Sequence, residues 1–246
     1  MRKTAIIVLS LLFGGTVSAQ VSIPAGRPAE TERPAADAAA GERIWTEFHA
    51  AEIEGAMRVR FLPADAEHPV GIGYSAADFK DGKFVNKVED GVLKLKMRRS
   101  RDTLQVTVRY NKLDAVTAAE AAVAFDGVLA AHSLDVKVSG GATFEAVLDV
   151  SDLKLEVTGT SRVILSGKTR YMDAVVSTAS VDAGRLEAMA VGADASHKAE
   201  VTVRATDRIV MRATTGAVIR YAGMPAIERS NMPSILSGSL QRITDN

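Results

Sequence analysis

From residue 43 onward the chain alternates apolar and polar residues in short stretches rich in β-branched side chains. The clearest examples are 92–97 (VLKLKM) and 104–110 (LQVTVRY), and Gly, Asp and Asn separate such stretches. A period of two is typical of a strand with one buried and one exposed face. The pattern therefore predicts strands throughout. Its main competitor is the Ala-rich stretch 116–125, whose composition also suits a short helix.

The alternation recurs as an internal repeat in the C-terminal half. Five similar stretches begin at Leu134, Leu153, Met172, Leu186 and Ile209. Their starts are 19, 19, 14 and 23 residues apart, so the short and the long interval together make nearly two standard ones. A corner of small or polar residues follows each stretch, at 139–143, 158–161, 177–180, 192–196 and 214–217. A second strand follows some corners, at 144–148, 162–165 and 200–203.

A repeat of about 19 residues with two short strands and no helical segment predicts an all-β parallel solenoid, because one coil cannot bury its apolar face alone. Inward columns are expected at the stretch starts and two residues further on, at Val136, Leu155, Ala174, Ala188 and Met211. On the outside, Asp135, Lys154 and Asp173 fall in one column, and Lys137 falls beside Glu156. Opposite charges would then meet across neighbouring strands.

Two other all-β architectures stay open. An antiparallel β-sandwich of hairpins would not require a regular repeat, and propeller blades of four strands run at about 40 residues. The regular spacing favours the solenoid over both.

The first residues have the pattern of an export signal. Arg2 and Lys3 precede an apolar run over 5–13, and the small residues at 17–19 suit a signal peptidase. Cleavage after Ala19 is therefore expected. The absence of Cys at that point excludes a lipid anchor on a modified cysteine.

The chain is thus expected to have three parts. These are a signal peptide over 1–19, a disordered Pro- and Ala-rich tether over 20–42, and a single solenoid domain over 43–246. Within the domain, 43–112 would form N-terminal strands or a cap, and 113–246 the repeats. No later stretch reaches the roughly 18 apolar residues of a membrane span, so no transmembrane segment is expected. We expect an exported protein that is periplasmic, secreted or at the cell surface.

Composition excludes several classes of function. The chain has 30 Lys+Arg, 30 Asp+Glu and no Cys. Formal neutrality argues against a nucleic-acid binder, and the lack of Cys excludes disulfides, thiolate metal sites and thiol catalysis. The histidines are scattered without metal-ligand spacing, at His49, His68, His132 and His197. Calcium-binding nonapeptide repeats are also missing, so no metal or other cofactor is expected.

Carboxylates are the main candidates for catalysis. Asp149 and Asp152 flank a predicted turn, and Asp173 and Asp182 lie on one repeat, so stacked coils could bring a pair together for glycoside cleavage. Soluble turns and outward strand faces explain the same residues more simply. Neither a Gly-x-Ser-x-Gly elbow nor a phosphate-binding Gly-x-x-x-x-Gly-Lys-Ser/Thr loop occurs. We assign no catalytic residue.

The densest group of charges is the weak candidate for ligand binding. It consists of Lys94, Lys96, Arg98, Arg99 and Arg101. These side chains could contact anionic glycan or lipid headgroups. A solvated face that protects a sheet edge from pairing is the simpler interpretation. Trp and Tyr residues are far apart in sequence and could form a sugar-stacking platform only if the coils bring some together: Trp45, Tyr74, Tyr110, Tyr171 and Tyr221.

The corners also carry a resemblance to a family. The matching segments are 138–143 (VSGGAT), 157–161 (VTGTS), 193–196 (ADAS) and 216–225 (GAVIRYAGMP). At these residues the chain resembles a bacterial exported family described as "putative auto-transporter adhesin, head GIN domain", a domain of unknown function. The resemblance covers roughly 43–225. It implies a right-handed parallel β-helix that is export-associated and non-enzymatic, and it carries over no catalytic residue.

The leading hypothesis is a non-catalytic exported β-solenoid that presents a repetitive surface for binding or adhesion at the bacterial cell envelope. Its partner is unknown and would be an envelope or anionic glycan, or a protein. One alternative is a polysaccharide-active enzyme on a β-helix, which needs acidic and basic residues converging in one groove. Another is a structural envelope protein that assembles through open solenoid ends.

Overall fold

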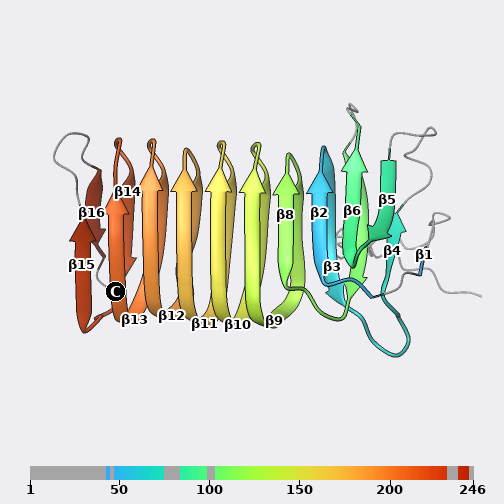
Figure 1. Cartoon of the computed structure of the whole chain (residues 1–246), viewed down its shortest axis with the longest axis horizontal. Coiled ribbons are helices and arrows are strands. Elements are labelled where there is room, and N and C mark those ends of the chain that lie inside the picture. The colour runs from blue at the N-terminus through green and yellow to red at the C-terminus, as the bar shows by residue number, and fades with distance from the viewer. Residues whose placement is uncertain (1–42, 45–46, 75–83, 99–102, 232–237, 244–246) are drawn as a thin grey trace, which may run out of the picture. The chain divides into compact units, whose positions relative to one another are not determined.

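The computed structural model describes residues 43–44, 47–74, 84–98, 103–231 and 238–243, which belong to one compact unit over 37–246. These described residues form strands and contain no helix (Figure 1). The strands are β1 (Arg43–Ile44), β2 (Ala50–Glu54), β3 (Met57–Pro63), β4 (Gly71–Tyr74), β5 (Phe84–Glu89), β6 (Val92–Met97), β7 (Leu104–Tyr110), β8 (Ala115–Ala119), β9 (Ala122–Ser139), β10 (Thr143–Thr158), β11 (Arg162–Ser177), β12 (Ser180–Ser196), β13 (Glu200–Ala213), β14 (Val218–Ala222), β15 (Ile227–Asn231) and β16 (Ser239–Arg242).

The fold is a parallel β-solenoid whose coils each contribute a limb to two facing sheets. The front sheet, nearer the viewer in Figure 1, has the order β5-β6-β2-β8-β9-β10-β11-β12-β13-β15. The back sheet has the order β1-β4-β7-β3-β9-β10-β11-β12-β13-β14-β16. The front limbs run upward while the coils advance to the left, which is a right-handed path (Figure 1). The predicted fold class is confirmed, and parallel pairing of the repeats rules out the hairpin sandwich.

The register corrects one of the five predicted stretches. Leu134, Leu153 and Met172 align as predicted, but their partner on β12 is Val191, followed by Ile209 on β13. The intervals are therefore 19, 19, 19 and 18 residues in place of 19, 19, 14 and 23. The predicted alignment of Leu186 with Met172 was wrong. Leu186 has the same apolar–polar alternation around it, but it lies on the other side of the bend in β12, where it pairs with Gly167.

The same error displaced one predicted column and one corner. Ala193, and not Ala188, continues the second inward column between Ala174 and Met211. Residues 192–195 lie inside β12, and the corner that follows β12 is His197 and Lys198, both with positive φ. The predicted outward pairs are confirmed. Lys154 is in register with Asp135 and Asp173, and Lys137 Nζ lies 3.6 Å from Glu156 Oε2.

Two kinds of change of direction shape each coil. At the upper corners, pairs such as Gly140 and Gly141 take positive φ, which favours glycine. The residue that follows a corner is small and buried, as Ala142, Ser161, Ala179, Ala199 and Ala217 show. At the lower bend the chain stays hydrogen bonded to its neighbours, so β9 to β13 are single bent strands of 14 to 18 residues where two short strands were predicted.

The core is a set of apolar columns between the two sheets. Val136, Leu155 and Ala174 are each no more than 1% exposed. Near the start of the repeats the back-sheet side of the core is aromatic: the Phe61 and Phe125 rings stack with centres 4.7 Å apart, and the Phe144 ring centre lies 5.6 Å from that of Phe125. Burying such rings supplies a large share of the hydrophobic stabilisation of a core.

The N-terminal strands do not follow chain order along the solenoid. The β2–β3 pair lies between the β6–β7 coil and the coil formed by β8 and β9. β1, β4 and β5 then pair antiparallel at the end beyond β6 and β7. The Ala-rich stretch 116–125 falls in β8 and β9, so the helical alternative for it was wrong. In these strands the alanines occupy both inward-facing and outward-facing positions, and the inward ones pack among larger side chains.

Candidate functional site

Two lysines of the predicted basic cluster project from β6, and each is held by a carboxylate. Lys94 Nζ lies 3.3 Å from Glu89 Oε2, and Lys96 Nζ lies 2.8 Å from Glu54 Oε2. The hydrogen bond that Lys96 donates to Glu54 raises the pKa of Lys96. These pairs reduce the positive charge that the two lysines offer to an anionic ligand.

The three arginines of the cluster follow β6. Arg98 is exposed, and Arg99 and Arg101 lie outside the described residues. Binding of anionic headgroups through these arginines stays a prediction.

The four candidate carboxylates do not converge. Asp149 and Asp152 flank the bend of β10. Lys168 Nζ lies 3.1 Å from Asp149 Oδ2, and His132 Nε2 lies 4.0 Å from Asp152 Oδ2. A carboxylate that is already paired is not poised as a free acid or base.

Asp173 and Asp182 lie on different sheets. Asp173 projects from the front limb of β11, and Asp182 projects from the back limb of β12, where it accepts a hydrogen bond from the Gly184 N–H at 3.2 Å. The proximity predicted for them is therefore not formed across the coil. Among the described residues no group of three or more His, Asp or Glu side chains could hold a metal ion.

The tyrosines also remain separate. Tyr110 packs against Phe61 in the core, and burial raises the pKa of Tyr110 to about 12. The Tyr221 hydroxyl donates to Glu228 at 2.6 Å, and this bond raises the pKa of Tyr221. Tyr171 is the exposed member, with the Arg170 guanidinium carbon 5.3 Å from its ring centre. Trp45 lies outside the described residues.

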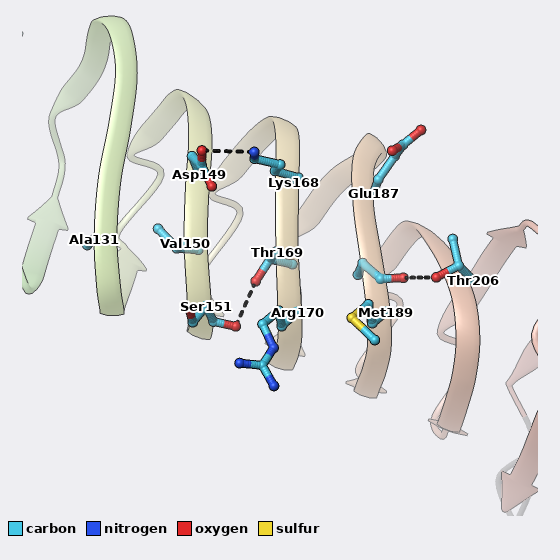
Figure 2. Close-up of a pocket in the computed structure, with 11 residues that line it drawn as sticks. Ala131, Asp149, Val150, Ser151, Lys168, Thr169, Arg170, Glu187, Met189 and Thr206 are labelled. Carbon is cyan, nitrogen blue, oxygen red and sulfur yellow. Dashed lines mark hydrogen bonds and ion pairs between the residues drawn. The ribbon is translucent and has the colours of Figure 1, made fainter.

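A groove crosses the lower bends of the repeat coils (Figure 2). Its volume is about 480 Å³. The residues that line it come from five consecutive strands: Ala131 from β9; Asp149, Val150 and Ser151 from β10; Lys168, Thr169 and Arg170 from β11; Glu187, Ala188 and Met189 from β12; and Thr206 from β13. Since neighbouring strands are about 4.8 Å apart, five strands span about 19 Å.

Bends of the backbone create this groove. Gly167 has φ +101°, and a Cβ there would overlap the Leu148 carbonyl oxygen, so only glycine lets β11 turn against β10. Register shifts also occur where β12 meets β13, on both sides of Ala188. At such a shift one residue is left without a ladder partner and the strand bends.

Hydrogen bonds fix the floor of the groove. The buried Thr169 hydroxyl donates to the Ser151 carbonyl at 3.3 Å or the Tyr171 carbonyl at 3.1 Å. The Thr206 hydroxyl donates to the Ala188 carbonyl at 3.4 Å. These threonines tie neighbouring coils together at the bend, and Figure 2 shows two of the contacts.

The rim of the groove carries charge and one exposed thioether. Asp149 and Lys168 form their pair across two coils, and Glu187 continues the same column on the next coil. Figure 2 shows Arg170 and Glu187 directed away from the floor. Met189 is 49% exposed. The groove therefore offers charges of both signs around a partly apolar floor, which suits reversible binding of an extended molecule.

The sequence contained a signal for this column that the search for catalytic pairs missed. Asp149, Lys168 and Glu187 are spaced by 19 residues, the length of one coil, and alternate in sign. The groove was not predictable from the sequence. The incorrect alignment of Leu186 with Met172 placed the next residue, Glu187, on the front limb, away from Lys168 with which it is in register.

The fold is a parallel β-solenoid with a surface groove across the bends of its repeats. The chain belongs to the family described as "Putative auto-transporter adhesin, head GIN domain", whose sequence profile matches residues 76–225. No curated protein matches the chain.

Solved structures share the fold at low sequence identity. A "putative adhesin" from Bacteroides fragilis is 18% identical with a TM-score of 0.71, covering 83% of this chain and 94% of that one. A "putative adhesin" from Parabacteroides distasonis is 17% identical, with a TM-score of 0.65 and coverage of 83% and 96%. A "putative lipid binding protein" from the same species is 14% identical, with a TM-score of 0.61 and coverage of 83% and 96%.

The described residues contain no helix long and apolar enough to cross a membrane.

Proposed function

We propose that the protein is a non-catalytic binding module of the bacterial cell envelope that holds an extended glycan chain in the groove at the lower bends. The observation that carries this proposal is the span of the groove over five consecutive strands. A site about 19 Å long fits several units of a polymer better than one small molecule. The family description, which names an adhesin, supports a binding role.

The distribution of charge supports a binding role over a catalytic one. Ion pairs are spread over the described coils, from Arg60 with Asp126 to Arg212 with Asp194 and Arg220 with Glu200. Two carboxylates line the groove, Asp149 and Glu187, and Lys168 forms an ion pair with Asp149. A glycosidase needs two carboxyl groups facing one bond with different proton affinities.

An exported location is part of the proposal. The pattern over residues 1–19 and the family description both suggest a protein that acts outside the cytoplasm. Within the envelope, the protein would be periplasmic, secreted or on the cell surface.

The test is binding of purified residues 20–246 to an array of bacterial envelope and host glycans at two salt concentrations. We expect binding to extended chains, lowered at least about fivefold by Arg170→Ala together with Met189→Ala, because both side chains border the groove. Arg162→Ala is the matched control, since Arg162 is exposed on the back sheet and does not line the groove.

Three results would contradict the proposal. A blank array would direct attention to a protein partner. Equal loss in the Arg162→Ala control would show that binding is not localised to the groove. Release of shortened chains from a bound glycan would favour the enzyme alternative.

A further inference from the structure

A hollow on the outer face of the front sheet lies beside the groove, since Met189 lines the groove and the next residue, Ala190, lines the hollow. We call it the front hollow. It opens over β12, where two successive outward positions hold the small residues Ala190 and Gly192. At the aligned positions β10, β11 and β13 carry larger side chains. The front hollow is therefore a gap in two outward columns of side chains.

The walls of the front hollow carry one aromatic ring and hydrogen-bonding groups. On β11, Tyr171 is 49% exposed, and Asp173 follows it at the next outward position. On β13, Arg208 is in register with Ala190, so it lies across the hollow from Tyr171. The volume of about 360 Å³ is at the lower end of the range for small-ligand sites, roughly 300–1,000 Å³. Such a volume suits one ring of a ligand better than a chain.

The charged groups on these walls are not used by the fold. Among the described residues, no hydrogen bond or ion pair engages the Asp173 carboxylate or the Arg208 guanidinium. Further along the same face, Arg212 pairs with Asp194 at 3.5 Å. A Cβ at Gly192 would lie 3.2 Å from Asp173 Oδ1, so the carboxylate leans toward β12 and the hollow. The acceptor on one wall and the donors on the other are therefore available to a ligand.

The Tyr171 ring adds an apolar surface to the site. The Arg170 guanidinium carbon lies 5.3 Å from the ring centre, and Arg170 lines the groove whereas Tyr171 lines the front hollow. An arginine over one face steadies the ring and leaves the opposite face for a ligand. The C–H groups on one face of a pyranose ring are slightly positive and pack well on the electron-rich face of an aromatic ring.

We propose that the front hollow is a second binding site, which holds one neutral pyranose ring with neighbouring hydroxyl groups. The sugar ring stacks on the face of Tyr171 opposite Arg170. Its hydroxyls donate to the Asp173 carboxylate and accept from the Arg208 guanidinium. A neutral sugar suits the site better than an acidic one, because Asp173 would repel a carboxylate. The site goes beyond the proposed function, since a free sugar can occupy it without a polymer in the groove.

The test is saturation-transfer difference NMR and titration of residues 20–246 with the methyl glycosides of glucose, galactose, mannose and N-acetylglucosamine. We expect at least one of these probes to bind with a dissociation constant of about 1 to 10 mM, because a ligand this small offers few contacts. The protons on one face of its ring should receive the largest transfer and shift upfield, since they lie over an aromatic ring.

Variants of the walls and the floor locate the binding. Tyr171→Ala should weaken it at least about fivefold, whereas Tyr171→Phe keeps the ring and should stay within about twofold. Asp173→Ala and Arg208→Ala each remove hydrogen bonds to the sugar and should weaken binding about threefold or more. Ala190→Leu should abolish binding, because its larger side chain fills the hollow from the floor.

Val175→Ala is the matched control for Tyr171→Ala. Val175 is 51% exposed on the same face of β11 and does not line the front hollow, so binding should be unchanged. Thermal unfolding followed by circular dichroism checks that Ala190→Leu stays folded, and Tyr171→Ala tests the site without adding bulk.

Two results would overturn the proposal: no transfer to any probe at about 50 mM, or binding that Tyr171→Ala and Ala190→Leu both leave unchanged. Neither residue 171 nor residue 190 lines the groove. Polymers that bind on the glycan array while the free sugars do not would therefore end this proposal and leave the proposed function standing. Free sugars that bind in the front hollow beside a blank array would do the reverse.

Discussion

The repeat coils and the N-terminal strands build the same two sheets by different routes. In the repeats each strand pairs with the next one along the chain, from β9 through β13. In the N-terminal part, β2 and β3 are inserted between strands that come later in the sequence. Because each repeat coil packs on its neighbours in the chain, the stability of the repeats is approximately a sum of terms from single coils and from contacts between adjacent coils. The N-terminal part depends instead on contacts between segments that are distant in sequence. The comparison shows that a solenoid can be continued by strands that carry no repeat.

The largest expected effect comes from removing the inserted pair. A chain of residues 76–246 keeps the segment that the family profile matches but lacks β1 to β4, which include the inserted pair β2 and β3. We expect no cooperative thermal unfolding, because β7 and β9 both lose their partner β3 and expose sheet edges. Circular dichroism with thermal unfolding is the measurement, and residues 20–246 are the control. A cooperative transition near that of the control would show that β6 and β7 can close directly on β8 and β9.

The next effect compares one bend from each region. At Gly167 in the repeats and at Gly55 between β2 and β3, φ is near +100° and a Cβ would overlap a carbonyl oxygen, of Leu148 and Met97 respectively. We expect Gly167→Ala and Gly55→Ala each to lower the free energy of unfolding by about 3 kcal/mol or more. Chemical denaturation measures both.

Gly73→Ala is the control for these two variants. A Cβ at Gly73 has no heavy atom within 4 Å, so a change within about 0.5 kcal/mol is expected. A mild effect of Gly55→Ala beside a severe one of Gly167→Ala would mean that the N-terminal strands can shift while the repeats cannot.

A third effect concerns pH and the N-terminal strands. Burial raises the pKa of Tyr110 in β7 to about 12 from the usual value near 10, so the folded state holds this proton more tightly than the unfolded state does. The stabilisation is complete below pH 10 and is lost as the pH rises from 10 to about 12. By linkage it amounts to about 2 to 3 kcal/mol. Tyr110→Phe should remove this part of the alkaline dependence of unfolding, and an unchanged pH profile would contradict it.

The smallest effect belongs to the outer face of the repeats. Lys137 and Glu156 form an ion pair between β9 and β10 with both side chains half exposed. A double-mutant cycle with Lys137→Ala and Glu156→Ala should give a coupling energy of about 0.5 kcal/mol or less, which falls as salt is added. A coupling above about 1 kcal/mol would show that charge columns, and not only the apolar columns, hold the coils in register.

Most of the repeat region was predictable from the sequence, with one failure inside it. Period-two alternation and a spacing of 19 residues were enough to predict strands, the parallel solenoid and the register of Lys137 with Glu156, because stacking turns a linear period into a column. The prediction failed at Leu186, where the two limbs of one coil have the same alternation. Only the backbone bend distinguishes them, and small residues such as Gly184 and Gly192 gave no clear sign of its place.

The sequence by itself thus determined the class of fold, the length of the coil and the sides of the strands, since each of these depends on residues that are near in sequence or related by the repeat. Tertiary structure alone decided where β2 and β3 are inserted, which bends leave a groove, and which side chains surround the hollow on the front sheet. These features arise from contacts between segments with no fixed spacing. Their energy comes from burial and hydrogen bonding across coils, which no local pattern encodes.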